Sequence, residues 1–188
     1  MTSCPSMRLW QVCIFLAACA AIAFVVGDAP RPHAASQRQA TWSEMRWPFP
    51  IDQWGTGRAF FCRASECGTD VQVYVRPKIG FCNCAEGVAD DADIDRVADV
   101  ELISGQYVGE GSGKAADVAN LKGRIRWYRI TAGPEGRLAL TVAFSKKCDV
   151  MVATAVAAPG SIRPSEPAIL EFLNGGTVTH WAERDLGV

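Results

Sequence analysis

Residues 138–144 are LALTVAF and residues 150–156 are VMVATAV, and only residues 145–149 separate the two runs. Both runs have the length of a strand and are rich in apolar, β-branched and aromatic residues, which favour the pleated conformation. Because these are the most apolar runs of the domain, we expect them at the centre of a sheet. They therefore indicate a domain that is built around β-structure.

Three further segments alternate in the same way and predict strands at residues 58–62, 71–75 and 124–130. In the second of these, Gln72 and Tyr74 share one face while three valines share the other. A period of two is the signal of a half-buried strand, since successive side chains point to opposite faces. The sequence thus predicts five strands.

Helical spacing is less frequent. Ser165 offers a hydroxyl cap to a helix whose first turn contains Pro167, and residues 174–176 (Asn-Gly-Gly) end that helix. Residues 90–100 are a further candidate helix, because their acidic residues are concentrated in what would be its first turn, where the helix dipole favours them. A short amphipathic helix at the end of the chain is predicted by the spacing of Val178, Trp181, Ala182 and Leu186. We expect an α+β domain with a mostly antiparallel sheet and two or three short helices on one face.

Residues 9–26 are apolar except for Gln11 and contain no charge. This length is at the lower limit for a helix that crosses a hydrocarbon core of about 30 Å, and its N-terminal position also suits a cleaved secretory signal. Residues 16–19 (Leu-Ala-Ala-Cys) resemble the lipobox of bacterial lipoproteins, but the apolar run continues to Val26. We expect a retained single-pass anchor, with a cleaved signal or a lipoprotein as alternatives.

The arginines that flank this segment favour the reverse orientation, because more of them follow it than precede it. The cysteines of the domain nevertheless favour an oxidising compartment. We therefore expect the C-terminal domain on the periplasmic or extracellular side of the cell membrane.

The expected domain organisation is an anchor or signal at residues 1–27, a tether at residues 28–54 and an exported domain at residues 55–188. The tether contains several prolines, which stiffen a chain, and it also contains Trp42, Trp47 and Trp54. These indole rings would lie either at the membrane–water interface or, in the favoured interpretation, in a strap that packs across the domain.

A formal net charge of −1 and the absence of a basic stripe exclude the electrostatic footprint of a nucleic-acid-binding protein. The expected partners are the membrane, through the N-terminal helix, and another envelope protein.

Five cysteines follow the apolar segment, which is typical of an exported domain with disulfides. Cys62 and Cys67 bracket a turn between strands and suit a local disulfide. Cys148 is a long-range partner for Cys82 or Cys84. The odd count leaves one thiol over. One alternative is a thiolate site for zinc or copper on Cys62, Cys67, Cys82 and Cys84, although their spacing is unusual and no histidine is near. The other is that the cysteines are free thiols buried in the core. The five are Cys62, Cys67, Cys82, Cys84 and Cys148.

Residues 109–114 (Gly-Glu-Gly-Ser-Gly-Lys) lack features that a phosphate-binding loop requires. Val108 occupies the position of its first glycine, and Ala115 replaces the hydroxyl that would bind magnesium. The segment is therefore predicted as a flexible loop between strands.

Asp91, Asp93 and Asp95 alternate like the start of a calcium loop, but Arg96 and Leu102 occupy its essential glycine and glutamate positions. We interpret these aspartates as the solvated start of a helix. No cofactor is expected outside the metal alternative.

The chain contains no nucleophile beside a base, so no catalytic residue is predicted. His33 lies in the tether, and His180 is expected at the surface of the final helix. The leading hypothesis is a membrane-anchored or secreted envelope protein with a disulfide-stabilised interaction domain. The alternative is a metal-handling or thiol-redox protein that uses the cysteine cluster.

Overall fold

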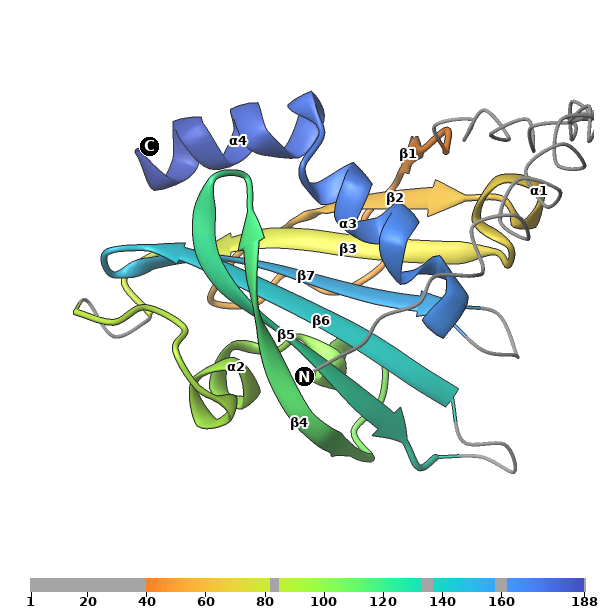
Figure 1. Ribbon diagram of the computed structural model, residues 1–188, viewed down its shortest axis with the longest axis horizontal. Coiled ribbons are helices and arrows are strands. Elements are labelled where there is room, and N and C mark those ends of the chain that lie inside the picture. Colours follow the sequence, from red (N-terminus) through yellow and green to blue (C-terminus); the bar gives the residue numbers. More distant parts are fainter. Residues whose placement is uncertain (1–39, 82–84, 133–136, 158–161, 188) are drawn as a thin grey trace, which may run out of the picture. The chain divides into compact units, whose positions relative to one another are not determined.

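The computed structural model describes residues 40–187, apart from residues 82–84, 133–136 and 158–161 (Figure 1). These residues belong to a compact unit that extends from Arg38 to Val188. The expected anchor at residues 9–26 lies outside the described residues. Within the described part of the chain, no helix is long and apolar enough to cross a membrane.

The described strands form one antiparallel sheet, which confirms the α+β domain with a mostly antiparallel sheet (Figure 1). Seven strands are arranged in the order β1-β2-β3-β7-β6-β5-β4. The strands are β1 (Ser43–Met45), β2 (Arg58–Cys62), β3 (Val71–Lys78), β4 (Tyr107–Val118), β5 (Leu121–Ile130), β6 (Arg137–Lys146) and β7 (Asp149–Ala157). The two apolar runs of the sequence, now β6 and β7, pair with each other and occupy inner positions of the sheet, as expected.

Helices lie on both faces of this sheet, and not on one face as the sequence analysis expected (Figure 1). The helices are α1 (Ala64–Cys67), α2 (Asp91–Val97), α3 (Glu166–Leu173) and α4 (Gly176–Leu186), with short 3-10 helices at Val100–Leu102 and Arg163–Ser165. The reason is that β6 and β7 are apolar on both sides. Val142 and Met151 pack in the core with α3 and α4, whereas Ala143 and Val152 pack in a second cluster with α2.

Strand β4 is the main departure from the sequence-based expectation, because residues 109–114 were predicted as a loop. They are instead part of an edge strand that pairs with β5 through a register shift between Glu110 and Lys114. A Cβ at Gly109 would lie 2.4 Å from an Arg126 nitrogen, and one at Gly113 would lie 2.6 Å from an Asp91 oxygen. The glycines that weaken the strand signal are thus the residues that make room for neighbouring side chains.

Residues 40–54, which we call the strap, pack on the folded unit. Ring contacts join Trp47 and Phe49 to Tyr74 with centroid distances of 6.0 and 4.7 Å, and Trp54 lies 4.8 Å from Phe81. These aromatic side chains are therefore half-buried against the domain itself, which agrees with the strap interpretation of the sequence.

The strap also crosses the edge of the sheet. Trp42 packs with the core on the side of α3 and α4, whereas Met45 and Trp47 pack with the cluster on the opposite face. Strand β1, which follows Trp42 and ends at Met45, pairs with β2. Residues 40–54, which the sequence analysis placed in the tether, thus contribute one strand and part of both cores.

The helix starts differ in how they are capped. Asp90 accepts from the backbone N–H of Asp93, and the Asp93 side chain accepts in return from the Asp90 N–H, which forms a capping box. The expected Ser165 cap of α3 is wrong, because the Ser165 hydroxyl donates to the carbonyl of Cys67 at 2.7 Å. That buried bond ties the start of α3 to α1.

Candidate functional site

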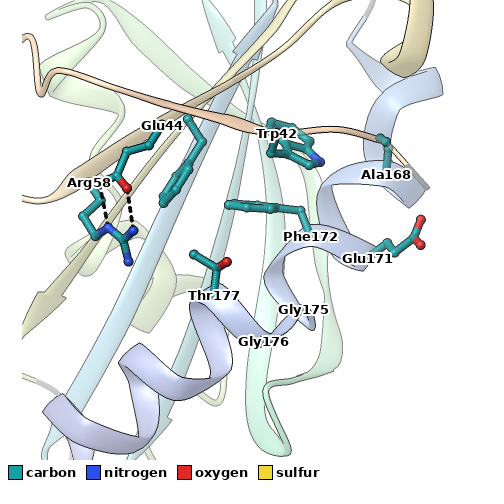
Figure 2. Close-up of a pocket in the computed structure, with 11 residues that line it drawn as sticks. Trp42, Glu44, Arg58, Ala168, Glu171, Phe172, Gly175, Gly176 and Thr177 are labelled. Atoms are coloured by element: carbon teal, nitrogen blue, oxygen red, sulfur yellow. Dashed lines mark hydrogen bonds and ion pairs between the residues drawn. The ribbon is translucent and has the colours of Figure 1, made fainter.

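A pocket of about 350 Å³ lies between the strap and the α3–α4 corner, where β1 and β2 reach the edge of the sheet (Figure 2). Its size is at the lower end of the range for ligand-binding pockets. Three separate parts of the sequence build it: the strap, β2 and the two C-terminal helices. Its lining residues are Ala40, Trp42, Glu44, Arg58, Phe60, Ala168, Glu171, Phe172, Gly175, Gly176 and Thr177.

Three aromatic rings form the apolar wall of the pocket. Trp42 stacks on Phe172 with a centroid distance of 4.6 Å, and Phe60 lies 4.8 Å from the same ring (Figure 2). Phe60 is buried, whereas Trp42 and Phe172 are half-buried. The wall therefore combines a fixed inner ring with two rings that still present surface to the pocket.

An ion pair forms the polar side of the pocket. Arg58 donates from Nε and Nη2 to the two carboxylate oxygens of Glu44, at 2.8 and 2.6 Å. The guanidinium also lies over the rings of Phe60 and Trp181, at 5.1 and 5.4 Å from their centroids. The hydrogen bond from Arg58 lowers the pKa of Glu44 below its usual value. Both groups are therefore charged at neutral pH and largely neutralise each other.

The corner between α3 and α4 closes the pocket. The carbonyl of Gly175 accepts from the N–H groups of Val178 and Thr179, and no side chain caps the start of α4. A Cβ at Gly175 would lie 3.0 Å from the carbonyl of Phe172, so a glycine allows this close turn. Glu171 is exposed, and its carboxylate points away from the aromatic rings (Figure 2).

A buried charge cluster lies away from this pocket and joins β3 to two other segments. Arg76 donates to both oxygens of Asp99 at 2.7 and 2.6 Å and also pairs with Asp52 of the strap. Lys78 contacts Asp99 at 2.8 Å and donates to the carbonyl of Val97. All of these hydrogen-bonding groups have partners within the fold, so the cluster is structural.

The predicted solvated aspartates on α2 form a second network. Asp91 pairs with Arg124 and Arg126 of β5, and Asp95 pairs with Arg126 and accepts a hydrogen bond from Tyr128. Burial and the Asp95 carboxylate raise the pKa of Tyr128. The helix start was predicted correctly and Asp95 is exposed as expected, but the ion pairs of Asp91 and Asp95 were not predicted, because their partners come from a distant strand.

The cysteines in the described part of the chain are oxidised. Cys62 and Cys67 form the local disulfide that their spacing suggested, across the short helix α1. Cys148 is also disulfide-bonded. Cys82 and Cys84 lie outside the described residues. In this state Cys62 and Cys67 cannot be thiolate ligands, and no group of three or more metal-ligating side chains occurs among the described residues.

No histidine is among the described residues that line the pocket. His180 is exposed on α4, as expected, and His33 lies outside the described residues. The pocket residues themselves escaped sequence analysis, because Trp42, Arg58 and Phe172 belong to segments that are remote from one another. The tryptophans of the strap could have indicated that this segment helps to form a site, since large apolar residues in a tether are unusual.

No family model matches the chain, and no curated protein matches it. Among solved structures, one similar chain is a Pseudomonas aeruginosa protein of unknown function described as a putative regulator. It is 12% identical, with a TM-score of 0.39, over 72% of this chain and 81% of that chain.

Proposed function

We propose that the domain is a binding module and that its ligand occupies the pocket between the strap and the α3–α4 corner. The observation that carries this proposal is the aromatic wall: Trp42 and Phe172 stack on each other and keep part of their surface exposed. Aromatic side chains that face a pocket supply large contact area with little loss of side-chain freedom, which suits recognition.

The charged groups of the pocket favour binding over catalysis. They are Glu44, Arg58 and Glu171. The first two are held in a bidentate ion pair, and the third is exposed to solvent. A general acid or base needs a proton to exchange near neutral pH, and a carboxylate whose pKa is lowered by an arginine does not provide one.

We also propose that residues 9–26 hold this domain at the outer face of the cell membrane. The apolar segment and the disulfide-bonded cysteines support this setting. A reporter that works only outside the cytoplasm, fused after Val188, should be active, and one that works only in the cytoplasm should be silent. The opposite pattern would contradict the orientation.

The binding proposal is tested with small aromatic probes. Indole and benzene derivatives, titrated into the ¹⁵N-labelled protein, should shift the amide signals of Gly175, Gly176 and Thr177 together with the indole N–H of Trp42. Trp42→Ala should remove these shifts, while Trp54→Ala is the matched control because its ring packs on Phe81 elsewhere. Probes that bind equally well to the Trp42→Ala variant would contradict the proposal.

A further inference from the structure

Strand β1 is at the edge of the sheet, next to the pocket. It pairs with β2 on one side, and no described residue pairs with its other side. An edge strand presents a row of unpaired N–H and C=O groups, and an extended chain is the ligand that satisfies them in series. The backbone of β1 therefore offers hydrogen bonds that a compact small molecule cannot use fully.

The pocket lies beneath the same edge. Trp42 and Glu44 are two residues apart, so their side chains share one face, and both line the pocket. A strand added next to β1 would place every second side chain on this face, at the usual separation of about 4.8 Å between strands. One such side chain would meet Trp42 and Phe172, and a neighbour would meet the Arg58–Glu44 pair (Figure 2).

The charged side chains of the pocket favour extended segments of one charge over another. The pocket holds two carboxylates and one guanidinium, and Arg58 is already paired with Glu44. Glu171 is exposed and has no charged partner among the described residues. A segment with a basic residue beside its apolar side chain complements this rim, whereas an acidic one would be repelled.

A second copy of this chain is a poor occupant. Strand β1 has only three residues. Pairing over so short a length falls far below the roughly 1,200 Å² that specific protein–protein interfaces bury. The edge thus suits a short peptide segment.

We propose that the ligand is an extended peptide segment of a partner protein that adds to the edge of β1 and packs an aromatic or aliphatic side chain against the exposed surface of the stacked Trp42 and Phe172 rings, with a basic residue beside Glu171. This inference rests on the proposed function of the pocket and adds the class of ligand and its mode of binding.

The experiment selects random heptapeptides displayed on phage against the full-length protein with its disulfides intact. The selected peptides should contain an aromatic or aliphatic residue flanked by lysine or arginine. Synthetic copies should bind in a fluorescence polarisation assay, and Trp42→Ala should weaken binding at least tenfold while Trp54→Ala does not.

Backbone N-methylation of the best peptide then tests strand addition without altering the protein. In an added strand only every second N–H faces the sheet, so methylation should weaken binding at least tenfold at alternate positions and little at the others. Sensitivity to Trp42→Ala without this alternation would overturn strand addition and leave the pocket as the binding site.

Two further results would separate the two proposals. If the aromatic probes bind the pocket but no peptide is selected, or the selected peptides are acidic, the peptide inference is wrong and the proposed function stands. If neither probes nor peptides depend on Trp42, both proposals fail.

Discussion

At the scale of single residues, the buried charges of β3 are the most demanding feature of the fold. Arg76, Lys78 and Asp99 are each at most 2% exposed. Removing charges from water is costly, and the cost is offset here because each group has hydrogen-bonding partners at short distance. Asp99 contacts both cations and is therefore the residue on which the cluster depends.

We predict that Asp99→Asn lowers the free energy of unfolding by about 3–5 kcal/mol, the range found when one partner of a buried ion pair is removed. The substitution keeps the shape of the side chain but leaves Arg76 and Lys78 with Asp52 as their remaining carboxylate. Urea unfolding measures the change. Asp117→Asn is the control, because Asp117 pairs with Lys122 in an exposed ion pair, where an effect of about 0–1 kcal/mol is expected. Equal effects of the two substitutions would contradict this account.

The same residues show a limit of sequence interpretation. The strand at residues 71–75 was expected to end before Arg76, Pro77 and Lys78, which resemble the exposed end of a strand. It continues to Lys78 because Asp99 and the carbonyl of Val97, which come later in the chain, satisfy the two cations. The residue pattern of β3 does not indicate that its cations have partners so much later in the chain.

At the scale of elements, β4 shows how neighbours can impose a strand on an unfavourable sequence. Its glycines cost conformational entropy and carry no side chains to pack. Pairing with β5 along most of its length supplies backbone hydrogen bonds in compensation. Glycine at positions 109 and 113 then permits the Asp91–Arg124–Arg126 network to lie against the strand.

We predict that Gly113→Ala destabilises the domain by about 1–3 kcal/mol, the usual cost of forcing extra atoms into a packed site. The added Cβ would lie 2.6 Å from an Asp91 oxygen and 2.9 Å from the carbonyl of Ile125. Thermal unfolding followed by circular dichroism measures the loss. Gly105→Ala is the matched control, because no atom lies within 4 Å of a Cβ at that position. If residues 109–114 were a flexible loop, both substitutions would be silent.

At the scale of the whole molecule, the strap connects the two faces of the sheet. Trp42 packs on one face, Trp47 and Phe49 pack on the other, and Asp52 pairs with buried Arg76. The strap thus belongs to the packed unit, although the domain was expected to begin at residue 55.

We predict that residues 40–188 unfold cooperatively at a temperature close to that of the full-length protein. Residues 55–188 should melt roughly 10 °C lower or more, since 1 kcal/mol corresponds to about 2–4 °C in a domain of this size. Removing the strap uncovers Tyr74 and Phe60 and leaves Arg76 with one carboxylate fewer. Scanning calorimetry of both fragments, expressed in an oxidising compartment, measures the difference. Equal melting temperatures would show that the strap adds no stability.

The sequence by itself determined the class of the domain and most of its elements. The strands β2, β3, β5, β6 and β7 and the helices α2, α3 and α4 follow from local signals: a period of two, helical spacing, acidic first turns and glycines that end a helix. These signals are short in range, so they can be recognised without knowing what each segment packs against.

Only the tertiary structure decided the two-faced packing of the sheet, the strand character of β4, the role of the strap and the composition of the pocket. Each of these depends on contacts between segments far apart in the chain, such as Trp42 with Phe172 and Arg76 with Asp99. The physical reason is that burial and charge pairing depend on position in space, and a local pattern of residue types does not specify which distant segment supplies the partner.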